Sequence, residues 1–220
     1  MTENSASKIL QILKETLGMP NWTKSKRDPF ETLVVTIISQ NTADLNTARA
    51  FEKLSSCFEI SPEGLAKAPT EDIEEAIRSA GLFKSKAQTI KQAAIIVLNQ
   101  FHGSLAPLLS LPLDEARESL IQFPGVGPKT ADVVLLFSYG KSTIPVDTHV
   151  NRVSKRLGFV SMEGNYECVR NGLQKIFNPS DYLKVHLLLI AHGRKICRAR
   201  YPLCEVCPVN MYCPTRGQWG

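Results

Sequence analysis

The sequence Phe-Pro-Gly-Val-Gly-Pro-Lys-Thr-Ala-Asp-Val-Val, residues 123–134, determines the fold that we expect for this chain. Residues 114–121 before it resemble a short helix with acidic residues in its first turn, and Pro124 ends that helix. The glycines on either side of Val126 allow the backbone to turn within a few residues, and Pro128 suits the first position of a second helix. The stretch therefore predicts two helices joined by a tight glycine hairpin.

Lys129 follows directly, in the first turn of the predicted second helix. A cation beside the positive end of a helix dipole is unfavourable, which favours deprotonation to a nucleophilic amine. Taken alone, the position is equally compatible with an ordinary solvated lysine after a turn.

A carboxylate further along the chain gives Lys129 a candidate partner. Asp147, in the sequence Val-Asp-Thr-His-Val at 146–150, has the properties of an N-cap residue, and alone it would be only that cap. Residues 140–146 can span up to roughly 23 Å when extended, enough for the chain to return alongside the second helix. A lysine beside a carboxylate is the arrangement of Schiff-base chemistry, with an amine nucleophile and an acid–base partner.

The composition limits the class of protein. The chain is 43% apolar and 21% charged, which excludes a disordered protein and a membrane-embedded one. Its net charge of +5 permits an anionic partner. The polar N-terminus lacks a signal-peptide pattern, and no apolar run approaches the ~20 residues of a membrane span. We expect a soluble intracellular protein without membrane contact.

The cysteines predict a metal centre near the end of the sequence. Four of them have the spacing C-x6-C-x2-C-x5-C: Cys197, Cys204, Cys207 and Cys213. In an intracellular chain this density favours metal ligation over disulfides. One close pair with two outlying thiols suits an iron–sulfur cluster better than zinc, which remains the alternative. Cys57 and Cys168 lie apart and are expected to be buried on apolar helical faces.

The rest of the chain has the periodicity of helices. Residues 33–38 could form a strand, but no alternating partner segment lies nearby, so we expect a buried helix. A first helix is expected to be capped by Ser5 or Ser7 and to end near Gly18. Further helices are expected at residues 44–57, 61–66, 70–80, 86–101, 166–177 and 182–191. Roughly ten helices with short loops predict an all-α fold.

Four motifs together resemble the endonuclease III family: residues 123–131, residues 146–150, His-Gly-Arg at 192–194 and the four-cysteine loop. The members of this family are helix-hairpin-helix DNA glycosylases with a [4Fe-4S] cluster. The resemblance runs from about residue 29 to residue 214, with every motif in the order that the family has.

The resemblance implies a discontinuous layout with a DNA groove between two domains. A six-helix domain would comprise residues 22–140, with the helix-hairpin-helix at about 113–139. The cluster domain would combine residues 1–21 with residues 141–220.

The resemblance also implies a reaction. A damaged base in double-stranded DNA is flipped out of the duplex. Lys129 attacks the sugar C1′ and displaces the base, with Asp147 as proton acceptor and charge stabiliser. The resulting Schiff base allows β-elimination on the 3′ side of the abasic site. The chain is thus expected to be a monomeric bifunctional DNA glycosylase/AP lyase of base excision repair.

Several residues are expected to contact DNA. The hairpin of Gly125, Val126 and Gly127 would hold a phosphate through the amides of Val126 and Gly127, although Pro128 supplies neither an amide nor a charge. Basic residues elsewhere, Lys86 among them, are candidates for the salt-dependent part of binding. Arg198 and Arg200 are favoured, because the loop between the first two cluster cysteines meets the DNA backbone in this family. Gln40 or Asn41, together with Leu82, would fill the gap left by the flipped base.

The substrate is less closely defined. Bacterial relatives tend to have an acidic residue where this chain has Ile121. Oxidised pyrimidines are the first expectation, and uracil or thymine opposite guanine is the competing one. A third alternative is an iron–sulfur module that binds DNA without catalysis.

Overall fold

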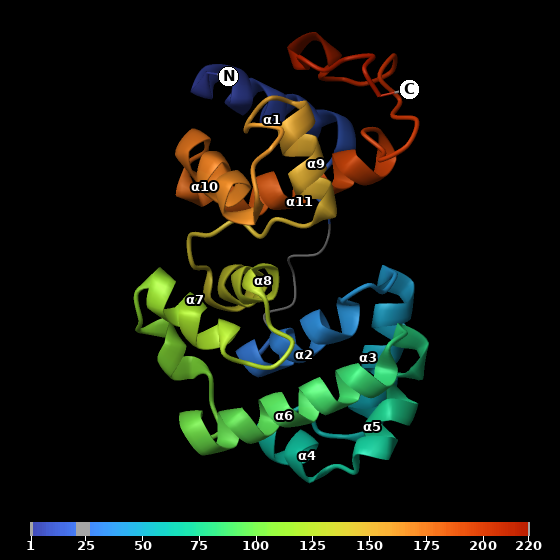
Figure 1. The fold of residues 1–220 in the computed structure, drawn as a ribbon, viewed down its shortest axis with the longest axis vertical. Helices are drawn as coiled ribbons and strands as arrows, with labels where there is room; N and C mark the ends of the chain where they lie inside the picture. Colours follow the sequence, from blue (N-terminus) through green and yellow to red (C-terminus); the bar gives the residue numbers. More distant parts are fainter. Residues whose placement is uncertain (1, 21–26, 220) are drawn as a thin grey trace. The chain divides into compact units, whose positions relative to one another are not determined.

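The computed structural model describes residues 2–20 and 27–219, which form helices joined by loops, without a strand in these two ranges (Figure 1). The expectation of an all-α fold is confirmed. The chain divides into two compact units, one of Lys26–Lys141 and the other of Met1–Ser25 with Ser142–Gly220. Nowhere in the described ranges does a helix combine the length and apolar character needed to span a bilayer.

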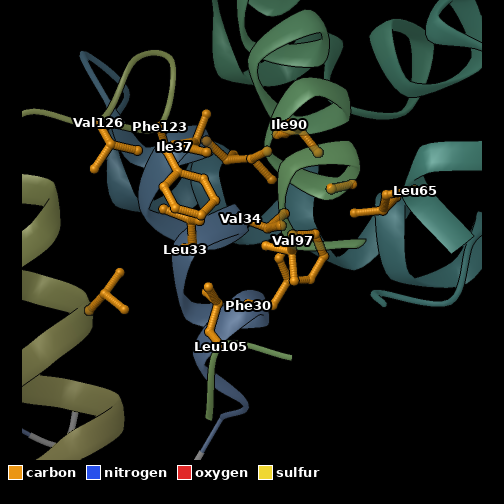
Figure 2. Packing of buried hydrophobic residues seen from close by; sticks show 14 of the residues in the cluster. Phe30, Leu33, Val34, Ile37, Leu65, Ile90, Val97, Leu105, Phe123 and Val126 are labelled. Atoms are coloured by element: carbon orange, nitrogen blue, oxygen red, sulfur yellow. The ribbon is translucent and has the colours of Figure 1, made fainter. Parts of the chain in front are cut away.

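The unit Lys26–Lys141 contains the helices α2 (Pro29–Ser39), α3 (Asp44–Cys57), α4 (Pro62–Lys67), α5 (Thr70–Ala76), α6 (Phe83–Phe101), α7 (Leu113–Ile121) and α8 (Pro128–Tyr139), with short 3₁₀ segments at Arg78–Ala80 and Ala106–Leu109. Helix α2 is central, because it contacts α3, α6 and α8. Figure 2 shows its apolar side chains, Phe30 and Leu33 among them, beside Val97 of α6 and Phe123 of the hairpin. The buried helix expected at residues 33–38 is confirmed.

The hairpin between α7 and α8 forms as the sequence predicts. Pro128 is the first residue of α8, and Gly125 has a φ of 69°, a left-handed conformation that favours glycine. A buried ion pair joins the two helices, with 3.2 Å between Arg117 Nε and Asp132 Oδ1 and no exposed surface on the Asp132 side chain. Hairpin geometry therefore depends on a contact between the helices as well as on the turn itself.

The second unit contains α1 (Glu3–Leu17), α9 (Thr148–Arg156), α10 (Tyr166–Ile176) and α11 (Tyr182–Lys195), with 3₁₀ segments at Pro179–Asp181 and Asn210–Tyr212. Helix α11 contacts α1 and α9, and α9 contacts α10. Their apolar faces form one core that includes Leu13, Val153 and Leu188. The four-cysteine loop follows α11.

Some element boundaries differ from the expectation. The cap of α1 is Thr2, whose hydroxyl accepts from the Ser5 amide at 3.4 Å, and the expected caps Ser5 and Ser7 lie inside the helix. The helix expected at 70–80 ends earlier, because Ile77 leaves the helical region with φ −101° and ψ 14°. Helix α6 begins at Phe83 rather than at residue 86.

The expectation that Cys57 and Cys168 are buried is wrong, because both are exposed. Cys57 is the last residue of α3, and the following Phe58 packs against the core instead. Cys168 lies in the first turn of α10, which buries Val169 and thereby turns the preceding residue towards solvent.

Candidate functional site

Lys129 is the second residue of α8 and follows the glycine turn in the sequence, and its side chain is half-buried. The first turn of α8 contains no acidic residue. A positive charge at this end of the helix is unfavourable, and no carboxylate of the same turn offsets it.

Asp147 is the N-cap of α9, as the sequence predicts. Its Oδ1 accepts from the Val150 amide at 2.7 Å, and its side chain is half-buried. Burial lowers the pKa of the neighbouring His149, the Asp147 carboxylate opposes this shift, and Arg152 adds to it. Asp147 thus has an anchored position beside cationic groups. Because Lys129 and Asp147 belong to different units, their action on one nucleotide stays a prediction.

The hairpin amides are not all available to a ligand. The Val126 amide donates to the Phe123 carbonyl at 3.0 Å, and the Val126 side chain is buried in the core. In this structure the Val126 amide is thus bonded within its own turn, and its contact with a phosphate stays a prediction. Gly127 is exposed, and an added Cβ at that position would meet open space. Gly127 and the start of α8 are therefore the parts of the hairpin that this conformation leaves open to an anion.

Two loops beside the hairpin carry the residues expected to enter the base stack. Gln40 Nε2 donates to the Gly125 carbonyl at 3.0 Å and lies 3.4 Å from Thr130 Oγ1. Asn41 is exposed with a φ of 51°. Leu82, in the turn before α6, is 67% exposed with a φ of 48°. Gln40 is thus engaged with the hairpin, while Asn41 and Leu82 are presented to solvent.

The four cysteines line one pocket after α11, together with Arg156 and Trp219. Burial raises the pKa of Cys197 and of Cys207, and Arg156 opposes this shift at Cys197, where its Nη1 lies 3.7 Å from Sγ. Among the described residues, no three His, Cys, Asp or Glu side chains lie close enough together to hold a single metal ion. Four thiols around a cavity with a guanidinium beside one of them fit the donor set of a [4Fe-4S] cluster, which carries negative charge on its sulfurs.

Arg156 also shapes the loop that follows Cys197. It donates to the carbonyls of Arg198 at 2.6 Å and Ala199 at 3.1 Å, and its guanidinium lies 4.4 Å from the Trp219 ring centroid. Arg198 and Arg200 are exposed on this loop. Sequence reasoning missed Arg156 and Trp219. The signal for Arg156 is its spacing: it follows Val153 by three residues and directly precedes Leu157, which places it on the apolar side of its helix.

Lys86, which the sequence offers as a candidate for contact with DNA phosphate, is buried. The candidate for phosphate contact is 4% exposed, and its ammonium group is bonded inside the protein. Burial lowers its pKa. Lys86 therefore cannot meet a phosphate on the surface in this conformation.

The fold and the hairpin define a class of protein. Residues 34–179 match the family model described as HhH-GPD superfamily base excision DNA repair protein. The match includes the hairpin, Lys129 and Asp147.

Individual relatives narrow the class. The chain is 39% identical over 188 residues to endonuclease III of Sulfolobus acidocaldarius, covering 85% of this chain and 82% of the relative. It is 35% identical over 205 residues to endonuclease III of Thermotoga maritima, covering 93% and 92%. A solved structure of a trapped endonuclease III–DNA covalent intermediate matches with a TM-score of 0.86 and 30% identity, covering 99% of this chain and 98% of that one. The chain belongs to the endonuclease III family, whose members are DNA glycosylases and AP lyases of base excision repair.

Proposed function

We propose that this enzyme excises oxidised pyrimidines from double-stranded DNA and then cleaves the strand 3′ to the abasic site through a Schiff base on Lys129. The observation that carries the proposal is a half-buried lysine in the first turn of α8, behind the glycine hairpin. A helix N-terminus is suited to DNA phosphate, and a lysine in that turn is close to any sugar that the hairpin holds.

The proposed reaction begins with the neutral amine of Lys129. Its lone pair forms a bond to C1′ of the flipped nucleotide, the glycosidic bond breaks, and the base leaves with the bonding electrons and takes up a proton. Asp147 accepts the proton that the amine loses and stabilises positive charge on the sugar. The ring-opened Schiff base then loses a C2′ proton, and the 3′ phosphate leaves by β-elimination. A covalent intermediate trapped with DNA in a structural relative supports this route.

Asn41 and Leu82 are the residues that we propose to fill the vacated stack. The alternative amide, Gln40, already donates to the Gly125 carbonyl and would have to break this bond to reach DNA. The exposure of Asn41 and Leu82 supports their assignment. Arg198 and Arg200, exposed on the loop that Arg156 shapes, supply phosphate contacts.

The proposed domain limits are 22–140 for the six-helix domain and 1–21 with 141–220 for the cluster domain. Compact units of Lys26–Lys141 and of Met1–Ser25 with Ser142–Gly220 support these limits. An intracellular monomer fits the proposal, because one enzyme acts on one lesion.

The hairpin contact with phosphate can be tested with two glycine variants. Gly125→Ala should lower the free energy of unfolding by about 1–2 kcal/mol, because φ there is 69° and the new Cβ would lie 2.9 Å from Thr89 Cγ2. Gly127→Ala should keep wild-type thermal stability and lose affinity for DNA, because only the close approach of a phosphate is obstructed. Calorimetry measures the stability of both variants, and fluorescence anisotropy with an abasic-analogue duplex measures their affinity for DNA. Wild-type affinity in Gly127→Ala would contradict the contact.

Cys197, Cys204, Cys207 and Cys213 are proposed to hold a [4Fe-4S] cluster. When bound, such a cluster ties the loop after α11 to the protein and offers one-electron chemistry. The fit of the donor set supports this assignment, since four thiols line one cavity and Arg156 lies beside Cys197.

Native protein purified without oxygen should be brown and contain about four irons and four sulfides per chain. Cys204→Ser should lose most of this iron, because a cluster held by three thiolates is less stable. Cys57→Ser and Cys168→Ser are matched controls and should keep it, because both residues are exposed and neither lines the cavity. A colourless protein with one zinc per chain would contradict the assignment.

One experiment tests the proposed function and separates it from its alternatives. The enzyme is incubated with duplexes containing thymine glycol, an abasic site or a G·T mismatch, with and without borohydride. Excision of thymine glycol with a trapped adduct supports the proposal. Excision limited to thymine or uracil opposite guanine supports the mismatch alternative. This alternative arises because Ile121, at the end of α7, stands where bacterial relatives tend to have an acidic residue. Binding without product would support the non-catalytic module.

A further inference from the structure

Lys86 occupies an unusual position for a lysine. It lies in the first turn of α6, it is 4% exposed, and its Nζ is bonded to three oxygens of other segments. These are the Ile38 carbonyl at 2.9 Å, the Thr42 hydroxyl at 2.7 Å and the Ala80 carbonyl at 2.8 Å. An ammonium has three hydrogens to donate, so these three acceptors match its capacity.

The segments that Lys86 joins are the two loops described above. Ile38 and Thr42 are on either side of the loop that carries Asn41, and Ala80 precedes the turn of Gly81 and Leu82. The Thr42 hydroxyl is also within a short contact of the Ala80 carbonyl, so the two loops meet directly at this point.

Both loops adopt a backbone conformation that needs support. Asn41 and Leu82 have φ values of 51° and 48°, which cost a residue other than glycine roughly 1–2 kcal/mol each. Such conformations persist where the surroundings hold them in place. The buried ammonium is the group that both loops share.

We propose that Lys86 is a positioning residue for opening the DNA: it holds the loop of Asn41 and the turn of Leu82 together, so that both side chains enter the base stack as one preformed wedge. The inference rests on the proposed function, in which these two side chains fill the vacated stack. Unstacking a duplex costs a few kcal/mol per step, and a wedge that is already ordered loses less entropy on insertion. Without Lys86 the two side chains would still be present, but they would no longer act as a unit.

A double-mutant cycle tests this coupling. Lys86→Met keeps an unbranched side chain that is one atom shorter and removes all three hydrogen bonds, and Leu82→Ala removes the proposed wedge residue. On a thymine-glycol duplex, kcat/KM should fall by about tenfold or more in each single variant. The double variant should lose little beyond Lys86→Met, because the leucine no longer contributes once its support is gone.

Two further readouts distinguish positioning from general stability. Cleavage of a single-stranded abasic oligonucleotide, where no stack must be opened, should stay within about twofold of wild type in Lys86→Met. Fluorescence of 2-aminopurine next to the lesion should rise on wild-type binding and fail to rise with Lys86→Met. The matched control is Lys91→Met on the same helix, whose Nζ donates to the Ala68 carbonyl at 2.6 Å, far in sequence from both loops. It should behave as wild type in both assays.

The outcomes separate a failure of the positioning role from a failure of the proposed function. Independent losses that multiply in the double variant, or a 2-aminopurine fluorescence that rises with Lys86→Met as it does with the wild type, would overturn the positioning role while leaving the glycosylase intact. A wild-type protein inactive on every substrate would overturn the proposed function and this inference with it. If Lys86→Met does not fold, Thr42→Val, which removes one acceptor of Lys86 and the contact with Ala80, takes its place in the same cycle.

Discussion

Replacing Lys129 by Gln is expected to abolish borohydride trapping and to lower strand cleavage at abasic sites by about 10³-fold or more. The amide has no lone pair that can form a Schiff base, while its size and polarity keep the first turn of α8 in place. Trapped adduct is measured on denaturing gels with an abasic-site duplex, and folding is checked by thermal unfolding. DNA affinity should change by less than about tenfold, because the hairpin amides remain.

The control removes a lysine without touching the site. Lys53→Gln, at an exposed lysine paired with Glu75 at 3.3 Å in the same unit, should keep full lyase activity. Excision that survives in Lys129→Gln with unchanged kcat would show that a water molecule, rather than this amine, attacks the sugar. The protein would then be a monofunctional glycosylase.

Replacing Asp147 by Asn is expected to lower base excision by about 10²–10³-fold without loss of stability. Asparagine caps a helix as well as aspartate does, so the bond from the Val150 amide is kept while the negative charge is lost. The loss of activity therefore reports the carboxylate as proton acceptor and charge stabiliser, separately from its role as a cap. Single-turnover excision of thymine glycol and the unfolding temperature are the two measurements.

Asp147→Ala removes both the carboxylate and the helix cap, and loss of the cap alone lowers the free energy of unfolding by about 1 kcal/mol. Asn165→Ala is the matched control, because Asn165 caps α10 in the same unit and accepts from the Cys168 amide at 3.0 Å. It should lose similar stability with full activity. Equal activity in Asp147→Asn and wild type would reduce Asp147 to a structural cap, the interpretation that its sequence alone also permits.

The features predicted correctly from the residues are those that depend on local chemistry. Gly125 and Pro128 define a turn and a helix start through their own backbone preferences, and both are found where expected. Asp147 caps α9 because a side-chain oxygen reaches an amide three residues on. The spacing of the cysteines places four thiols in one short loop, so they line one cavity.

The features predicted wrongly or left open depend on partners far away in the sequence. The bond from Gln40 to the Gly125 carbonyl, which bears on the open choice between Gln40 and Asn41, is not revealed by any residue near position 40. The solvent exposure of Cys57 and Cys168 follows from which neighbouring residue packs into the core. Periodicity indicates an apolar face but not where that face meets its partner.

By itself, the sequence determined the hairpin, the candidate nucleophile and carboxylate, the thiol loop and an all-α chain, because each is encoded by neighbouring residues or by helical periodicity. Long-range packing, in contrast, places the Lys86 ammonium inside the protein rather than on the surface, and it leaves the Val126 amide bonded within its own turn. The physical reason is the same in both cases. Whether a donor is available to DNA depends on which acceptors the folded chain brings within about 3 Å of it, and those acceptors are specified by packing rather than by the adjacent sequence.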